Sequence, residues 1–339
     1  MIGQETHEVE RKIRAILQIL SDSPRPLGGR VVAQRLKEQG IDLNERTVRY
    51  HLKIMDERGF TRQMGDRDGR MITELGLEEL RSALVCDKIG FVTDRLEVLA
   101  FFTSFDPSTT NSGIVPIDVS FFPEHDFPRA MELMAGVFRA GLCISNLVAV
   151  AHEGERLGGT PVPQGKIGLA TVSAAVVSGA MLKAGIPVDF RFGGILQFRN
   201  HRPVRFTDLI EYYGSTVDPF EVFVAARMTS VSSTAQYGDG NILASFQELP
   251  LPSKTMAETI LRQLQTAGLC HASFMGKANE LLYEIPVKMN KVGLVIPSGL
   301  NAAAAAAEAG IPVTSKAMNG ITPVSELKDF YQLWARGAC

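Results

Sequence analysis

The chain has 339 residues, of which 45% are hydrophobic and 21% are charged, and its formal net charge is −2. This composition is typical of a folded protein of two or three domains, and the near-neutral charge excludes a protein that coats nucleic acid indiscriminately. The four cysteines, at positions 86, 143, 270 and 339, lack CxxC spacing, which argues against a zinc ribbon or a disulfide framework. No apolar run is long enough to span a membrane, and residues 1–23 are too charged for a signal peptide. We therefore expect a cytoplasmic protein.

The first 59 residues predict three helices joined by short connections. Apolar residues recur at helical spacing from Val9 to Leu20 and again from Val31 to Leu36. Asn44 is a good N-cap and Gly59 a good stop for the third helix. Three helices in this order are typical of a helix-turn-helix fold.

The third helix has an apolar face and a basic face. Val48, Leu52 and Met55 repeat at i, i+4 and i+7, and residues 46–70 hold seven Arg or Lys against four Asp or Glu (7 − 4 = +3). A solvated basic face is the alternative to a DNA contact, and the neighbouring elements decide between them. Side chains of this kind suit phosphates and base edges, so we assign DNA contacts to Arg46, Thr47, Arg49, Tyr50 and Lys53.

A hairpin follows the third helix. Residues 60–64 and 70–73 are strand-like and flank a run of Gly and Asp that favours a turn. A hairpin at this position is typical of the wing of a winged helix, with Arg62, Arg67 and Arg70 as candidate phosphate or minor-groove contacts. A winged helix that binds protein is the alternative. The order of elements also resembles winged-helix domains of bacterial and archaeal regulators and the one attached to ribonuclease R.

These patterns predict three regions. Residues 1–82 form a winged helix-turn-helix DNA-binding domain, and residues 83–112 form a linker, with an amphipathic helix around Leu96, Leu99 and Ala100. Residues 113–339 form an effector-binding and oligomerisation domain.

This last region contains an internal repeat. Residues 155–188 align with residues 280–313 without a gap and are identical at 14 of 34 positions. We therefore predict an α/β regulatory domain made of two duplicated, pseudo-symmetric halves, at about residues 113–216 and 240–336. Each half has a strand, an amphipathic helix, further strands and an alanine-rich helix that a serine, Ser173 or Ser298, caps. The next strand is expected at Ile-Pro-Val, from Ile186 or Ile311.

The starts of these two alanine-rich helices are candidate anion sites. A helix N-terminus favours carboxylate or phosphate groups, so Thr171, Ser173, Ser298 and Asn301 could hold the two ends of a dicarboxylate. His152 is near a turn at Gly158-Gly159-Thr160 in the sequence and could also contact an anion. Serine capping and a structural histidine are the alternatives. Cys143 and Cys270 correspond in the repeat, so thiol or metal sensing is another hypothesis, with buried small side chains as its alternative.

The sequence contains no nucleophile–base–acid spacing, Walker loop or HExxH motif. We therefore predict no catalytic residues, no bound metal and no cofactor. An enzyme acting on a small metabolite, with the winged helix as an adaptor, remains the alternative from another functional class.

Several short runs resemble the NrpR family of nitrogen regulators. They are DKIGFV (87–92), AGLC (140–143), GIPV (185–188), FTDLIEYYG (206–214), DP (218–219) and NGI (319–321). The resemblance implies a homodimeric or higher homo-oligomeric repressor that binds an inverted-repeat operator of nitrogen-assimilation genes. It also implies allosteric release by 2-oxoglutarate, a small dicarboxylate, with Cys143 as a candidate effector contact from its motif. Some members carry two regulatory domains, whereas this chain has length for only one.

Overall fold

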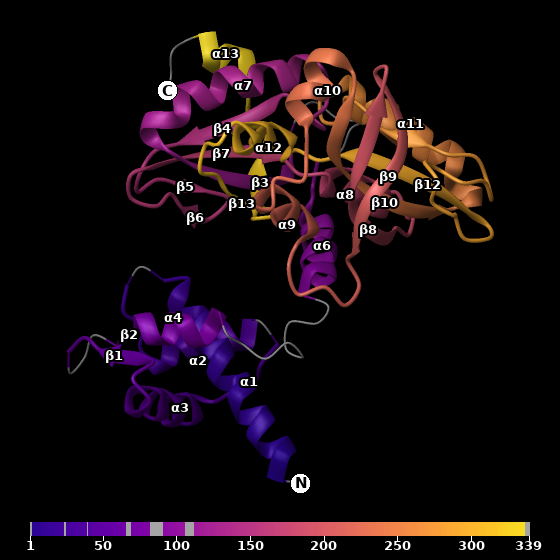
Figure 1. Cartoon of the computed structure of the whole chain (residues 1–339). Helices are drawn as coiled ribbons and strands as arrows, with labels where there is room; N and C mark the ends of the chain where they lie inside the picture. The colour runs from indigo at the N-terminus through magenta and orange to yellow at the C-terminus, as the bar shows by residue number, and fades with distance from the viewer. Residues whose placement is uncertain are drawn as a thin grey trace. The chain divides into compact units, whose positions relative to one another are not determined.

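The computed structural model describes residues 2–23, 25–38, 40–65, 69–81, 91–105 and 112–335. Contacts between Cα atoms divide the chain into two compact units, residues 1–88 and 89–339, and each unit is considered by itself (Figure 1). In the described ranges, none of the helices combines the length and the apolar character that crossing a bilayer requires.

The first unit is a three-helix core followed by a two-stranded hairpin. Its elements are α1 (Ile2–Ser21), α2 (Gly29–Glu38), α3 (Glu45–Glu57), β1 (Thr61–Gln63), β2 (Arg70–Ile72) and α4 (Glu74–Arg81). The apolar stripes meet in one core, which includes Ile16, Leu36 and Leu52. The predicted helices and the hairpin are confirmed.

Helix α3 begins and ends where its local sequence predicts. The side-chain oxygen of Asn44 accepts a hydrogen bond from Thr47 N at 2.9 Å, which satisfies one of the free N–H groups of the first turn. Gly59 has φ +75°, a left-handed conformation that suits glycine at a helix end. Val48, Leu52 and Met55 are all fully buried, so the apolar stripe is the core face.

The second unit begins with α6 (Phe91–Phe102), which lies within the predicted linker but packs on α8. Its first run of elements is β3 (Ile114–Pro123), η1 (Glu124–Asp126), α7 (Phe127–Arg139), β4 (Leu147–Ala151), β5 (Arg156–Leu157), β6 (Thr160–Pro161), β7 (Lys166–Val172), α8 (Ala175–Lys183), β8 (Asp189–Arg199) and β9 (Arg202–Glu211). Two short helices, α9 (Pro219–Ala225) and α10 (Val231–Tyr237), lead to the second run.

The elements of the second run are β10 (Gly240–Pro250), η2 (Leu251–Ser253), α11 (Lys254–Thr266), β11 (Phe274–Met275), β12 (Lys291–Pro297), α12 (Asn301–Glu308), β13 (Thr314–Lys316), β14 (Ile321–Pro323), η3 (Val324–Glu326), β15 (Lys328–Asp329) and α13 (Phe330–Ala335). The second run has a similar order to the first as far as α12, but it has one short strand, β11, where the first run has β4, β5 and β6.

The two main sheets exchange strands. One has the order β13-β3-β7-β4-β15 and the other β11-β12-β10-β8-β9. Strand β8 follows α8 in the first run but pairs with β10 of the second, whereas β13 follows α12 but pairs with β3 of the first. Figure 1 shows β8 beside β10 and β13 beside β3. Each sheet is therefore completed by a strand from the other run.

Helices join the two runs as well. The alanines of α12 are buried, and this helix packs on α7 of the first run. Similarly, α11 packs on α8, and both contribute to a second apolar core. Small side chains permit the close approach of α12 that the alanine run predicts.

Two local predictions are wrong by one to three residues. The strands after the alanine-rich helices begin at Asp189 and Thr314 rather than at the Ile-Pro-Val segments, because proline lacks the N–H that a ladder needs. The predicted serine caps also fail: α8 and α12 have no side-chain cap on the preceding residues Ala174 and Leu300. Ser298 instead accepts from Leu300 N at 3.2 Å within the turn before α12.

Candidate functional site

The predicted DNA-binding face of α3 is open to solvent. Arg46, Arg49, Tyr50 and Lys53 are exposed, Tyr50 to 63%. Arg49 pairs with Glu45 at 2.6 Å, and Lys53 lies 3.9 Å from Glu57. Exposed pairs of this kind are weak, so their cations are available to phosphates.

Thr47 and the wing residues differ in role. Thr47 Oγ1 donates to Asn44 Oδ1 at 3.0 Å, so its hydroxyl belongs to the cap of α3. Arg62 is exposed on β1, whereas Arg67 lies outside the described residues. Arg70 is only 20% exposed and pairs with Asp56 at 2.6 Å. The prediction that Arg70 contacts DNA is therefore not supported by its geometry, because its charge is used to hold the wing to α3.

The predicted effector residues of the second unit do not form an open pocket. Asn301 is fully buried, and its side chain accepts from Leu243 N at 2.8 Å and donates to Leu142 O and Leu243 O at 2.7 and 3.0 Å. Because these bonds occupy the amide, Asn301 joins two segments rather than presenting a free group. His152 is exposed at the end of β4.

The cysteines are buried in different cores. Cys143 Sγ lies 3.8 Å from Gly299 O, and burial raises the pKa of its thiol to about 12. Burial likewise raises the pKa of Cys270 to about 12. Cys143 and Cys270 belong to separate apolar clusters. Thiols of this kind are poor nucleophiles, so the thiol-sensing hypothesis gains no support. Cys86 and Cys339 lie outside the described residues.

The ends of β7 and β12 meet around Gly299. A Cβ atom on Gly299 would collide with the carbonyl oxygen of Val172 and lie 2.9 Å from Thr171 Oγ1 and 3.2 Å from Asp118 Oδ2. Thr171 pairs with Asp118 across β7 and β3, and its buried hydroxyl has no partner in the described structure. Glycine is therefore required where these strand ends converge.

Beside these converging strand ends lies a small enclosed space, which we name the acidic cavity. It is lined by Leu96, Asp118, Ser173, Ala174, Ala175, Phe190, Tyr212, Asp218, Phe220, Ser245, Gln247 and Met318. Of the predicted effector residues, only Ser173 lines it. The sequence patterns do not identify its carboxyl groups as site residues, although a charged residue at position 118 within an apolar strand is a visible signal.

Both carboxyl groups of the cavity have raised pKa values. Burial raises the pKa of Asp118 to about 6, against hydrogen bonds from Met318 N and the Ser173 hydroxyl. Burial, followed by the charge of Glu221, raises the pKa of Asp218 to about 7. Tyr212 also has a pKa above its usual range, chiefly because of burial. An anion is disfavoured here, because it would lie beside two carboxyl groups.

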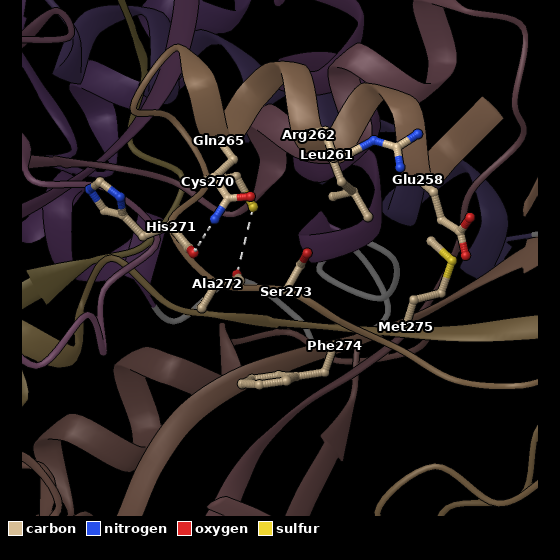
Figure 2. A pocket seen from close by; sticks show the side chains of 10 residues that line it. All are labelled: Glu258, Leu261, Arg262, Gln265, Cys270, His271, Ala272, Ser273, Phe274 and Met275. Carbon is tan, nitrogen blue, oxygen red and sulfur yellow. Dashed lines mark hydrogen bonds between the residues drawn. The ribbon is translucent and has the colours of Figure 1, made fainter. Parts of the chain in front are cut away.

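Two open grooves lie on the second unit. One has a volume of about 470 Å³ and is lined by residues of α11, of β11 and of the segment between them, including Arg262, Cys270 and His271 (Figure 2). Here Gln265 Nε2 donates to His271 O at 3.5 Å. Desolvation lowers the pKa of His271, so this groove has Arg262 as its basic group.

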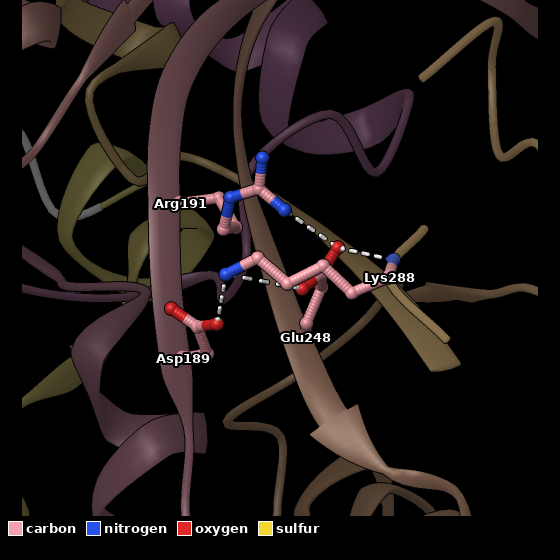
Figure 3. A network of polar contacts seen from close by, with 4 residues as sticks. All are labelled: Asp189, Arg191, Glu248 and Lys288. Carbon is pink, nitrogen blue, oxygen red and sulfur yellow. Dashed lines mark hydrogen bonds and ion pairs between the residues drawn. The ribbon is translucent and has the colours of Figure 1, made fainter. Parts of the chain in front are cut away.

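The other groove, of about 480 Å³, contains Arg191 and Lys288. Arg191 donates to Glu248 at 2.7 Å, and Lys288 Nζ donates to Asp189 at 2.8 Å (Figure 3). Glu248 is fully buried, and Lys288 Nζ also lies 3.9 Å from its Oε2, so the two cations offset a buried carboxylate. Across the described part of the chain, no three His, Cys, Asp or Glu side chains come together as a metal ion needs.

Known proteins resemble both units. Residues 89–329 match the family described as NrpR regulatory domains NRD1 and 2, and residues 14–80 match the ribonuclease R winged-helix domain. The chain is 38% identical to the global nitrogen regulator NrpRI of Methanosarcina mazei, over 95% of this chain and 97% of that protein.

Other relatives are longer or more distant. The global nitrogen regulator NrpR of Methanococcus maripaludis is 28% identical, over 92% of this chain and 54% of its own length. This chain therefore spans about half of that relative. A solved structure of a nitrogen repressor-like protein from Methanococcus jannaschii has the same fold, with a TM-score of 0.59 and 24% identity, over 70% of this chain and 98% of that one.

Proposed function

Because this chain belongs to the NrpR family of nitrogen regulators, we propose that it is a DNA-binding repressor of nitrogen-assimilation genes. The family is one of regulators rather than enzymes. The observation that carries the proposal is the exposed basic face of α3, with Arg46, Arg49 and Lys53, in a unit that has a winged-helix fold.

The proposed mode of binding uses α3 and the wing of the first unit. Helix α3 enters the major groove, where its N-terminal half reaches base edges, and Arg62 of the wing contacts the backbone or minor groove. Two subunits of a homo-oligomer bind an inverted repeat whose half-sites are about 34 Å apart, one turn of DNA. This spacing makes binding sensitive to any rotation between subunits.

The effector proposed is 2-oxoglutarate, on the basis of the family resemblance. It releases the operator only as far as it binds the two conformations unequally. The acidic cavity would repel this dianion, so we place the effector outside it and do not assign Ser173, which lines it, as a ligand. Thr171, Ser298 and Asn301 are left unassigned as well, because all three are buried. We also infer that the two runs of the second unit are duplicated halves, whose relative closure transmits effector binding to the DNA-binding units.

The test is fluorescence anisotropy of the full chain with a labelled duplex from upstream of its own gene, at fixed salt because phosphate contacts make affinity salt-dependent. A duplex of scrambled sequence is the control. We expect tight binding to the upstream duplex only, weakened at least tenfold by millimolar 2-oxoglutarate but not by millimolar succinate.

Each alternative outcome identifies what is wrong. Specific binding that ignores 2-oxoglutarate would retain the regulator and reject the effector. Equal affinity for both duplexes would reject a sequence-specific repressor.

A further inference from the structure

Two carboxyl groups line the acidic cavity, and no cationic side chain of the described residues lines it with them. They belong to Asp118 and Asp218, which are 2% and 4% exposed. Burying a carboxylate in apolar surroundings is costly unless a proton or a cation neutralises it. The cavity therefore suits a positively charged occupant.

One oxygen of the Asp218 carboxyl group has no hydrogen-bond partner in the described structure. Asp218 Oδ1 accepts from Phe220 N at 2.8 Å and Glu221 N at 3.4 Å. Its Oδ2 is buried without a hydrogen bond in the described structure. Asp118 differs, because its Oδ1 accepts from Met318 N at 2.8 Å and the Ser173 hydroxyl also bonds its carboxylate. A ligand would therefore bind first at Asp218 Oδ2.

Neutral oxygen atoms complete a possible ligand set. Ser245 Oγ donates to Ile296 O at 3.4 Å, and Gln247 Oε1 accepts from Ser178 Oγ at 3.1 Å. A hydroxyl and an amide oxygen each have two acceptor positions, so both atoms keep capacity to bind a cation. The rest of the wall is largely apolar and includes Phe190 and Phe220.

The size of the cavity restricts the occupant. Its volume is about 10 Å³, which is about the room that a single particle of the size of a water molecule needs. Ammonium and potassium ions are of this size, whereas any organic cation is larger. Divalent metals are disfavoured, since the described chain has no group of three suitable ligands.

We propose that the acidic cavity binds one monovalent cation of ammonium or potassium size, with Asp218 Oδ2 as its principal ligand. Ammonium donates hydrogen bonds to these oxygens, and potassium is coordinated by the same atoms. Asp118 lies on β3 and Ser245 on β10, so the bound ion joins both sheets of the second unit. The site is separate from DNA binding and does not rest on the proposed effector.

The experiment is thermal unfolding of the full chain at pH 8 in ammonium, potassium or tetramethylammonium chloride at equal ionic strength. We expect ammonium or potassium to raise the unfolding temperature saturably, by about 3 °C relative to tetramethylammonium. The ion with the lower half-saturation concentration is the one the cavity prefers.

Two variants locate the effect. Asp218→Asn keeps Oδ1 for the cap of α9 but removes the charge, and we expect it to abolish the ion-dependent shift. Glu308→Gln is the matched control: Glu308 also accepts from N–H groups at a helix start, Val231 N at 2.6 Å, but it does not line the cavity. We expect this variant to keep the shift.

A crystal soaked in rubidium chloride gives a readout that does not depend on a variant. We expect an anomalous peak in the cavity beside Asp218. The same unfolding temperature in all three salts, a shift that Asp218→Asn retains, or no rubidium peak in the cavity would each overturn the proposal.

Discussion

Arg70 Nε lies 2.6 Å from Asp56 Oδ2, and this ion pair joins the second strand of the wing to the end of α3. Asp56 also accepts from Thr61 Oγ1 on the first strand at 2.6 Å. One carboxylate thus positions both strands of the hairpin. The orientation of the wing relative to the recognition helix depends on it.

Replacing Arg70 tests this structural role. In Arg70→Met, the carboxylate of Asp56 loses its cation while it remains mostly buried, so we expect the free energy of unfolding to fall by about 1–3 kcal/mol. Urea denaturation measures it. The control is Arg62→Met at an exposed position, for which we expect a change within about 0.5 kcal/mol. Equal losses in the two variants would contradict a special role for Arg70.

Replacing Arg46 tests the DNA face. We expect Arg46→Gln to weaken binding and to reduce the slope of log affinity against log salt by about 1, because one phosphate or base contact is lost. Anisotropy titrations at several salt concentrations measure the slope. Arg202→Gln, at an exposed position on β9 of the second unit, is the control and leaves the slope unchanged. An unaltered slope in Arg46→Gln would remove α3 from the proposed contact.

The buried carboxyl groups predict an unusual dependence of stability on pH. Asp118 and Asp218 have folded-state pKa values of about 6 and about 7, against 3.8 for an exposed group. From about pH 4 to 7 the folded state therefore holds more protons than the unfolded state, and these groups make the free energy of unfolding fall as pH rises. Glu221 and Tyr212 also interact with Asp218, and the cations Arg95 and Lys316 act on Glu221.

Asp218→Asn measures this contribution. As pH rises from 5 to 7, the free energy of unfolding of the variant should increase relative to that of the natural chain by on the order of 1–3 kcal/mol. The reason is that asparagine does not titrate, whereas Asp218 loses its proton over this range. Denaturation in tetramethylammonium chloride avoids competition from small cations. Parallel stability curves for the two proteins would show that Asp218 titrates normally.

Two glycines give opposite predictions. Gly299→Ala places a Cβ atom against the carbonyl oxygen of Val172, so we expect a loss of about 2–4 kcal/mol or failure to fold. Gly136 lies within α7, and a Cβ there would meet no atom within 4 Å apart from the adjacent residues and the backbone of its own helix. Gly136→Ala should therefore stabilise by about 0.5–1 kcal/mol, through the lower backbone entropy of the unfolded chain. Thermal unfolding distinguishes them, and a neutral Gly299→Ala would show that the strand ends can separate.

Much of the first unit can be derived from the sequence, because its signals are local. Val48, Leu52 and Met55 identify the buried face of α3 by spacing alone, and Asn44 and Gly59 identify its ends within one turn. Arg70 is the exception. Its role depends on Asp56, 14 residues away, and composition does not distinguish an arginine that meets DNA from one that meets a carboxylate.

The order of elements in the second unit was also predictable from its periodic runs, whereas strand pairing was not. The sequence does not say that β8 pairs with β10 and β13 with β3, because partners along a sheet are chosen by packing between distant segments. Asp118, on β3, and Asp218, the N-cap of α9, are 100 residues apart, and the tertiary fold brings both carboxyl groups to one cavity. The local elements and the basic face of α3 can thus be read from residue order alone. Which polar groups are buried together depends on the tertiary fold, because desolvation and charge pairing depend on distance in space rather than along the chain.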